Sequence, residues 1–493
     1  MNILHAFSIN NVGLLHYVGT ALIVTVLVVT IRRLFFDPLA KIPGPWYAKW
    51  TDVVLKIKSL SATGPIYVDK LHEKYGPMVR LGPSQVGVTD ISAAKKIHTV
   101  KGDYVKTDYY LGLGYRKENV INTQDPETHR RHRKLLSQPI SERSLKAMEP
   151  QIEEKIRLTI KRMGEEMKTR GAADVYKWWM FMATDTIGQL TFGESFHMLE
   201  RGEVNTEIKD IQLIGAVSSI GTQLKAVMPI LYHIRLPGFT DSLKTMSDRQ
   251  STSAIAKLQK LGEEMESKDQ LLFTKLVKGL TMEGESLTGT ELVYNAEGYI
   301  AAGSDTTSNT LTYSTWALCR NPELRDQLVK ELENLPADFT DEHLKALPYL
   351  NHVIQEALRR FPVIPNGLPR YVPKEGAELG GYWLPGRTTV MTQAWSMHRN
   401  PEVFPNPDEF NPARWENPTK EMKDSMMAFG GGTRICLGMH LAYIELRLGL
   451  AHFFRTFPRA RVSTLEGMKD DDMIQALHVV ASPQSHRCLI EVL

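Results

Sequence analysis

Apolar residues recur at helical spacing along most of this chain, and nothing divides the helical stretches into separate domains. Residues three and four positions apart share one helix face, so each stretch predicts a helix with one buried side. No glycine-, serine- or proline-rich linker interrupts the 493 residues. The sequence therefore predicts one large, mainly α-helical domain. The expected helices are Ser141 to Lys168, Asp174 to Leu190, Glu291 to Cys319, Asn321 to Leu332, His343 to Arg360 and Leu437 to Phe457.

Strand patterns are fewer and predict only a small β-sheet region. The stretches concerned alternate apolar and polar residues, or carry β-branched residues around turn glycines and prolines. They are Met78 to Asp90, Leu379 to Gln393 and His486 to Leu493. The proline- and glycine-bearing stretches Phe361 to Glu378 and Asn400 to Phe429 are expected to be irregular.

The N-terminus differs in kind from the rest of the chain. Val12 to Ile31 contains no Lys, Arg, Asp or Glu and has about the length that spans a bilayer. Arg32 and Arg33 follow this run, whereas a cleaved signal peptide carries its basic residues before it. The sequence predicts a single-pass membrane anchor in residues 1–37 and a cytosolic domain in residues 38–493, separated by the stiff segment KIPGPW. A buried core helix is the alternative for Val12 to Ile31.

Charge and cysteine content exclude several classes of function. The 59 basic and 56 acidic residues leave a net charge of +3, and basic blocks with interleaved aromatic residues are absent from the sequence, so nucleic acid is not an expected partner. The only cysteines are Cys319, Cys436 and Cys488, too few and too scattered for a disulfide framework or a four-ligand zinc site. A functional cysteine in this chain must act alone.

Cys436 lies in FGGGTRICLGMHLA, where a glycine-rich loop leads into an expected helix. Gly432 and Gly438 remove side chains on both sides of the sulfur, which would let a flat group approach the backbone. The helix N-terminus favours a thiolate, and Arg434 adds a charge suited to a carboxylate. An inert buried thiol and a zinc half-site with His440 remain alternatives, whereas a phosphate loop would need a Gly-Lys-Ser/Thr sequence after the glycines.

The loop resembles the cytochrome P-450 haem-thiolate monooxygenases, whose motif is Phe-x-x-Gly-x-Arg-x-Cys-x-Gly. Each fixed position is matched, by Phe429, Gly432, Arg434, Cys436 and Gly438. Three further segments match in the family's order: AAGSDTTS at 301–308, EALR at 356–359 and FNPARW at 410–415. The resemblance implies the mainly α cytochrome P-450 fold with a small sheet, and a haem whose iron is bound by Cys436. The haem is expected to be b-type, because no Cys-x-x-Cys-His attachment motif occurs.

The resemblance also implies roles for charged residues outside the loop. Glu356, Arg359 and Arg414 would form the buried ion-pair cluster that braces the cysteine loop, although the first two residues alone would read as a surface helix pair. Arg370 would bind a haem propionate. Many family members have Trp-x-x-x-Arg where this chain has His129-x-x-x-Arg133, and we expect these two residues to bind the second propionate.

Basic residues beside this pair suggest a surface role. Arg130, Arg131 and Lys134 would then face away from the haem. They form either a solvated basic face or a docking surface for an acidic flavoprotein reductase.

Asp305 and Thr306 are the expected catalytic residues. An acid and a hydroxyl beside Gly303, whose missing side chain would leave space, could relay protons to bound dioxygen. A threonine hydroxyl bonded to its own helix is the alternative. Haem-thiolate isomerases and dehydratases commonly lack this pair, so its presence favours a monooxygenase supplied by NADPH-cytochrome P-450 reductase over those enzymes and over a haem sensor.

The complete set of motifs looks most like fungal secondary-metabolism members of the family. This resemblance implies hydroxylation, epoxidation, desaturation or demethylation of a hydrophobic polyketide, terpenoid or alkaloid intermediate at the endoplasmic reticulum membrane. A housekeeping sterol or fatty-acid hydroxylase is the alternative. The segments expected to line the pocket are mostly apolar and leave the substrate and its number of oxidations open.

Overall fold

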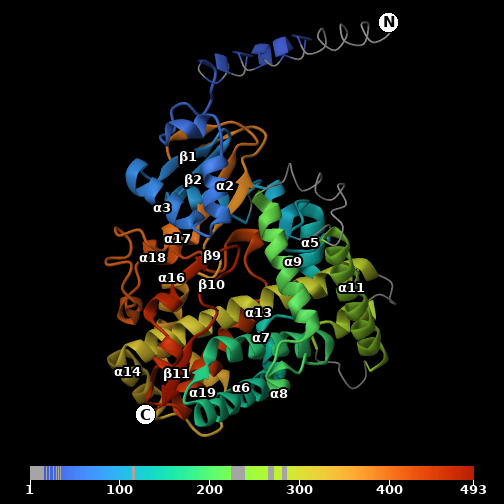
Figure 1. The fold of residues 1–493 in the computed structure, drawn as a ribbon, viewed down its shortest axis with the longest axis vertical. Coiled ribbons are helices and arrows are strands. Elements are labelled where there is room, and N and C mark those ends of the chain that lie inside the picture. Colours follow the sequence, from blue (N-terminus) through green and yellow to red (C-terminus); the bar gives the residue numbers. More distant parts are fainter. Residues whose placement is uncertain are drawn as a thin grey trace, which may run out of the picture.

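The computed structural model describes residues 16–17, 19–21, 23–25, 27–28, 30–31, 33, 35–100, 102–113, 117–223, 239–264, 271–279 and 286–492. Over these residues the chain is mainly helical with small sheets, as predicted (Figure 1). The α-helices are α2 (Val53–Leu60), α3 (Gly64–Tyr75), α4 (Ile91–Ile97), α5 (Pro126–Ser137), α6 (Glu142–Arg170), α7 (Val175–Phe192), α8 (Met198–Arg201), α9 (Thr206–Gln223), α11 (Phe239–Glu263), α12 (Thr274–Gly279), α13 (Gly289–Arg320), α14 (Pro322–Leu332), α15 (Asp341–Lys345), α16 (Pro348–Arg360), α17 (Ala394–Met397), α18 (Lys420–Ser425) and α19 (Met439–Thr456).

Helix α13 crosses the middle of the domain and packs along α7 (Figure 1). Its start is fixed by a capping box between Thr288 and Glu291. A Cβ atom on Gly303 would lie 2.9 Å from Cγ1 of Ile187 in α7. The expectation that Gly303 leaves space for a proton relay is therefore wrong, because this glycine allows close packing of two helices instead.

The largest sheet lies at the end of the domain nearest the N-terminal segment (Figure 1). Its strand order is β1 (Met78–Gly82), β2 (Gln85–Val88), β7 (Thr389–Gln393) and β4 (Gly367–Tyr371). The remaining strands are β3 (Ala173–Asp174), β5 (Ala377–Leu379), β6 (Tyr382–Leu384), β8 (Ala460–Val462), β9 (Gln475–Leu477), β10 (Ala481–Pro483) and β11 (Leu489–Val492).

Strand β4 corrects the expectation that Phe361 to Glu378 is irregular. It pairs antiparallel with β7 and carries Arg370 opposite Val390. Pro369 is tolerated because β4 ends the strand order of the sheet, where a missing N–H need not break a ladder bond.

The helix expected over His343 to Arg360 is also corrected. The structure has two helices there, α15 and α16, and Leu347 is the N-cap of the second. Pro348 explains the break, since proline lacks an N–H and fits the first turn of a helix better than its interior.

Of the expected anchor, Val12 to Ile31, residues 12–15, 18, 22, 26 and 29 lie outside the described residues. Among the residues that are described, none belongs to a helix long and apolar enough to cross a membrane. Asp37, at the expected domain boundary, pairs with Arg80 of β1, and both side chains are almost fully buried. Leu39 is 2% exposed, and Arg33 donates to the carbonyl of Pro83 at 3.0 Å, so residues on both sides of the expected boundary contact the folded domain.

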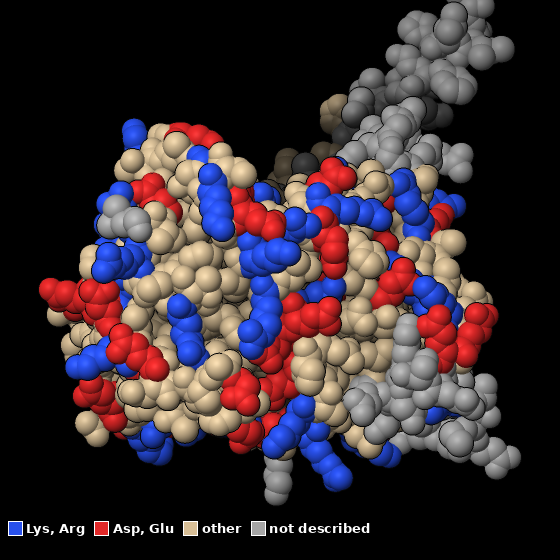
Figure 2. All heavy atoms as spheres, turned by 90° about the horizontal axis from the view of Figure 1, so that it is seen from below, with Lys and Arg blue, Asp and Glu red and all other residues tan. Residues whose placement is uncertain are grey.

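Surface charge is mixed on the face seen in Figure 2. Lys and Arg side chains are interspersed there with Asp and Glu, and neutral surface lies between them. The net charge of +3 is thus not gathered into one region of this face.

Candidate functional site

Cys436 follows the short helix η4 (Gly432–Arg434) and precedes α19. Its N–H donates to the carbonyl of Phe429 at 2.9 Å, which closes the loop. Burial raises the pKa of the thiol, while the N–H of Gly438 and the charge of Arg133 act in the opposite direction. The residue nevertheless keeps exposed surface, so the sulfur borders open space rather than packed side chains.

The glycines of the loop have distinct roles. A Cβ atom on Gly438 would lie 3.9 Å from Sγ of Cys436, as expected for a glycine beside the sulfur. Gly432 has a φ of +62°, and a Cβ atom there would lie 2.2 Å from the carbonyl oxygen of His98. Gly432 is therefore required by its backbone conformation and by packing on the residue after α4. Phe429 packs against Tyr443 with ring centroids 5.3 Å apart.

The middle of α13 also carries exposed surface, although residues on both sides of it are buried. Ala301 and Ala302 are exposed, and Thr306 is partly so. The hydroxyl of Thr306 donates to the carbonyl of Ala302 at 2.8 Å. Burial raises the pKa of Asp305 to about 6, so this acid can gain and lose a proton near neutral pH.

Four cationic side chains from different parts of the chain influence one another near Cys436. Arg133 donates to the carbonyl of Ile435 at 2.7 Å, and Arg434 donates to that of Thr123 at 3.0 Å. Arg370 donates to the hydroxyl of Tyr110 at 2.7 Å.

Lys106 completes this group. It pairs with Arg370 in an isolated β-bridge, and its ammonium group donates to the carbonyl of Ile121 and lies over the ring of Tyr110. The sequence did not indicate Lys106, because it lies in no motif and only the fold brings it to Arg370, whereas Tyr110 lies in a segment, Tyr109 to Gly114, that was expected to line the pocket. We call Lys106, Arg133, Arg370 and Arg434 the cationic cluster.

The cationic cluster lacks negative partners. In the described part of the chain, its members bond to backbone carbonyls and to Tyr110, and none forms an ion pair with a carboxylate. Burial and the neighbouring arginines lower the pKa of Arg434 to about 10 and hold that of Lys106 well below its usual value. Burial, followed by the charge of Arg434, lowers the pKa of His129 to about 3, so His129 is neutral here. The cluster is therefore suited to an anionic ligand.

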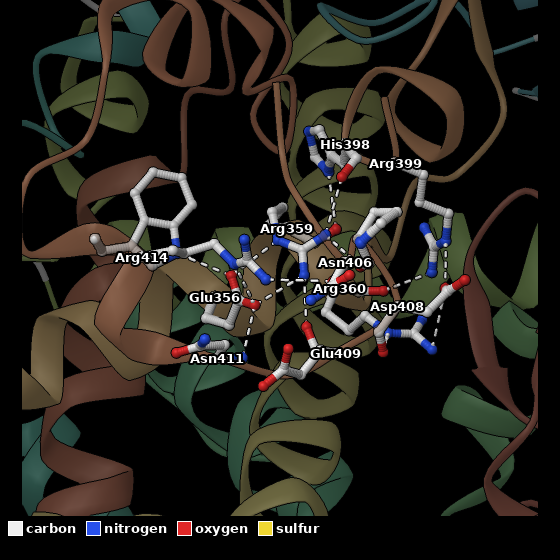
Figure 3. A network of polar contacts seen from close by, with 12 residues as sticks. Glu356, Arg359, Arg360, His398, Arg399, Asn406, Asp408, Glu409, Asn411 and Arg414 are labelled. Carbon is white, nitrogen blue, oxygen red and sulfur yellow. Dashed lines mark hydrogen bonds and ion pairs between the residues drawn. The ribbon is translucent and has the colours of Figure 1, made fainter. Parts of the chain in front are cut away.

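A second buried charged group, centred on Glu356 and Arg359, holds the segment from His398 to Trp415, which precedes the cysteine loop in the chain (Figure 3). Both side chains are 0% exposed, and Arg359 Nη2 lies 2.8 Å from Glu356 Oε1. Glu356 also accepts from Arg414 at 3.0 Å and from the indole of Trp415 at 2.9 Å. The predicted buried cluster of Glu356, Arg359 and Arg414 is thus present, and we call it the brace.

The basic residues of α5 are partly committed to internal contacts. Arg131 donates to the carboxylate of Glu291 and to the carbonyl of Ser286. Arg130 pairs with the exposed Glu127 at 2.8 Å. Arg131 is therefore less suited to dock a partner than its position in the sequence indicated.

Comparison with known proteins agrees with this geometry. The cytochrome P-450 family model matches residues 45–487. The cytochrome P-450 monooxygenase tazI of Aspergillus terreus is 44% identical over 481 residues, which is 96% of this chain and 98% of the relative. The monooxygenase aflV of Aspergillus parasiticus is 33% identical, with 96% and 95% covered, and the trichothecene C-15 hydroxylase of Fusarium sporotrichioides is 30% identical, with 88% and 89% covered.

A mainly helical fold, a cysteine with open surface before a helix and a cationic cluster suited to an anion agree with the class that the comparisons show, the haem-thiolate oxidoreductases. The chain belongs to the cytochrome P-450 family. It is a monooxygenase whose cofactor is a haem with cysteine-ligated iron.

Proposed function

We propose that Cys436 is the axial ligand of the haem iron. The observation that carries this proposal is the open surface of a thiol that otherwise lies in the protein interior, at the start of α19. A thiolate there is favoured by the helix N-terminus, by the Gly438 N–H and by Arg133. Gly438 permits close approach beside the sulfur, whereas Phe429 and Gly432 hold the loop in shape.

Haem propionates supply the negative charge that the cationic cluster lacks. Arg370 and Arg434 would bind propionate, and Arg133 and the neutral His129 would bind the second propionate, as the sequence predicts. Lys106 and Tyr110 belong to the same group. Tyr110 accepts a hydrogen bond from Arg370, and the ammonium group of Lys106 lies over the ring of Tyr110. Charge-assisted hydrogen bonds of this kind would repay the cost of holding several cations in the interior.

Asp305 and Thr306 would deliver protons during oxygen activation. When bound, thiolate-ligated haem favours cleavage of the O–O bond over reversible oxygen storage. Asp305 can exchange a proton near neutral pH, and Thr306 can release its bond to Ala302 and offer its hydroxyl.

We further propose that the substrate is a hydrophobic intermediate of a fungal secondary-metabolite pathway. One relative is named for hydroxylation of a trichothecene, and its similarity extends over 88% of this chain. Electrons would come from NADPH through cytochrome P-450 reductase at the endoplasmic reticulum. A housekeeping sterol or fatty-acid hydroxylase is not favoured by any feature of the structure.

Two measurements test this function. The reduced protein with carbon monoxide should show the thiolate-type spectrum, and Cys436→Ser should abolish it. Deleting the gene should remove one specialised metabolite and accumulate its less oxidised precursor, with sterols unchanged. Retention of the spectrum by Cys436→Ser would refute the ligand assignment, and a sterol defect would refute the proposed pathway.

The single-pass anchor and its domain boundary remain part of the proposal. Removing residues 1–36 should release a domain that binds haem, because the Asp37 to Arg80 pair is kept. Removing residues 1–37 should release a less stable domain, because Arg80 then stays buried without its carboxylate. Sedimentation with membranes after the shorter truncation would show that other surfaces bind lipid.

A further inference from the structure

His398 follows α17 and lies beside Arg359 of the brace (Figure 3). It is 0% exposed. It is not part of any motif used above, and its role is visible only from its contacts in the fold.

Two hydrogen bonds join His398 to Arg359 of the brace. The guanidinium of Arg359 donates to the carbonyl of His398 at 2.9 Å. In return, Nδ1 of His398 lies 3.1 Å from the carbonyl of Arg359. The end of α16 and the end of α17 are therefore held together in both directions.

The other ring nitrogen reaches the cysteine side. The N–H of Met427 donates to Nε2 of His398 at 2.8 Å. Since Nε2 accepts, Nδ1 must carry the proton and donate to Arg359, so one neutral tautomer satisfies both contacts. Burial and the charge of Arg359 lower the pKa of His398 to about 3, which keeps the ring neutral under working conditions.

Two backbone hydrogen bonds connect the segment that begins at Met427 to Cys436. The carbonyl of Met427 accepts from the N–H of Gly430 at 2.9 Å. The carbonyl of Phe429 accepts from the N–H of Cys436, also at 2.9 Å. A displacement of Met427 would therefore pass through this short turn to the residue that carries the sulfur.

We propose that His398 is a positioning residue that ties the brace to the start of the cysteine loop and thereby sets the place of Cys436 under the haem. This inference rests on the proposed role of Cys436 as the iron ligand. The contact with Met427 is the one that matters for the sulfur, because loss of the acceptor would leave a buried N–H unsatisfied and drive the loop to move. The contact with Arg359 anchors the ring.

Two amide substitutions separate these contacts. The amide of His398→Gln can occupy the place of Nε2 and accept from Met427, whereas the shorter amide of His398→Asn reaches only the place of Nδ1. We expect His398→Gln to keep the thiolate-type carbon monoxide spectrum and to lose haem to apomyoglobin within about twofold of the wild-type rate. We expect His398→Asn to lose haem roughly tenfold faster, with a smaller thiolate-type fraction.

Ser396→Ala is the matched control. Ser396 is a buried residue of α17, two positions before His398, whose hydroxyl accepts from Gln393 and, over the described residues, forms no hydrogen bond to the cysteine loop. It should keep both the spectrum and the rate of haem loss.

Equal behaviour of the Gln and Asn variants, including failure of both to accumulate, would overturn the inference. The inference would also be overturned if the rates of haem loss of all three variants followed their unfolding temperatures rather than the presence of an acceptor for the Met427 N–H. A wild-type protein without the thiolate-type spectrum would overturn the proposed function and this inference with it.

Discussion

The brace and the cationic cluster are both buried and rich in arginine, but they differ in how their charges are satisfied. Arg359 donates to both oxygens of Glu356 and to the carbonyls of His398, Pro407 and Glu409. Its whole guanidinium is thus matched within the protein. The cationic cluster, over the residues that the structure describes, has carbonyl and hydroxyl acceptors but no carboxylate.

The presence or absence of a carboxylate partner distinguishes an arginine with a structural role from one that can bind an anionic ligand. A buried cation with a matched carboxylate is destabilising to break, because removal of either partner strands the other. A buried cation without a counter-charge costs stability until an anion arrives. The two groups should therefore respond to charge removal with opposite signs in the haem-free protein.

The largest effect is expected for Glu356→Gln in the brace. The variant leaves Arg359 buried beside a neutral amide, and we expect the free energy of unfolding of the haem-free protein to fall by about 3–5 kcal/mol. Urea unfolding followed by circular dichroism measures it. Glu127→Gln, in an exposed pair with Arg130, should change stability by less than about 1 kcal/mol. Similar losses of unfolding free energy in Glu356→Gln and Glu127→Gln would contradict the structural role that we assign to the buried Glu356.

Lys106→Met in the cationic cluster should act in the opposite direction. Replacing a buried, unpaired cation by an apolar side chain of similar length should stabilise the haem-free protein by about 1–4 kcal/mol. The same variant should release haem faster, because a partner of the propionates is lost. Lys106→Arg keeps the charge and should keep the haem. Destabilisation of the haem-free protein by Lys106→Met would show that Lys106 is already satisfied in the fold.

The sequence predicted what depends on neighbours along the chain. Asp174 and Asn321 cap helices close to their expected starts, and α19 begins within a few residues of its predicted start. The match of Cys436 to its motif needed only adjacent residues. The brace was predicted by resemblance, since Glu356 and Arg359 look the same in sequence whether they lie on a surface or in a core.

The sequence did not predict what depends on distant partners. Gly303 was expected to leave space, but Ile187 of another helix fills it. Lys106 and His398 acquire their roles from Arg370, Arg359 and Met427, which are far away in sequence. Such contacts form only when the chain packs, so they cannot be predicted from residues that are neighbours in the sequence.

A smaller, pH-dependent effect is expected at Asp305. Its pKa is raised from 3.8 to about 6 by burial, so the folded state prefers the protonated acid. This preference contributes stability below about pH 4 that is lost as the pH rises through 6. Asp305→Asn removes the titration, so the variant should gain about 1–2 kcal/mol relative to wild type at pH 8 but not at pH 4. Urea unfolding across this range measures the difference, and a constant offset would contradict burial as the cause.

The smallest change in stability is expected for Thr306→Ala, together with a clear change in activity. Over the residues that the structure describes, the hydroxyl of Thr306 bonds only to the carbonyl of Ala302 in its own helix, so its loss should alter stability by less than about 1 kcal/mol. Product formed per NADPH consumed should nevertheless fall, with hydrogen peroxide released instead, because proton delivery is disturbed.

Thr306→Ser keeps a hydroxyl and should restore coupling, that is, the amount of product formed per NADPH consumed. Thr310 makes the same type of bond one turn further along α13, and Thr310→Ala should leave coupling unchanged. Equal coupling in the Thr306→Ala and Thr310→Ala variants would mean that Thr306 serves its helix alone, and Asp305 or water would then have to carry the protons.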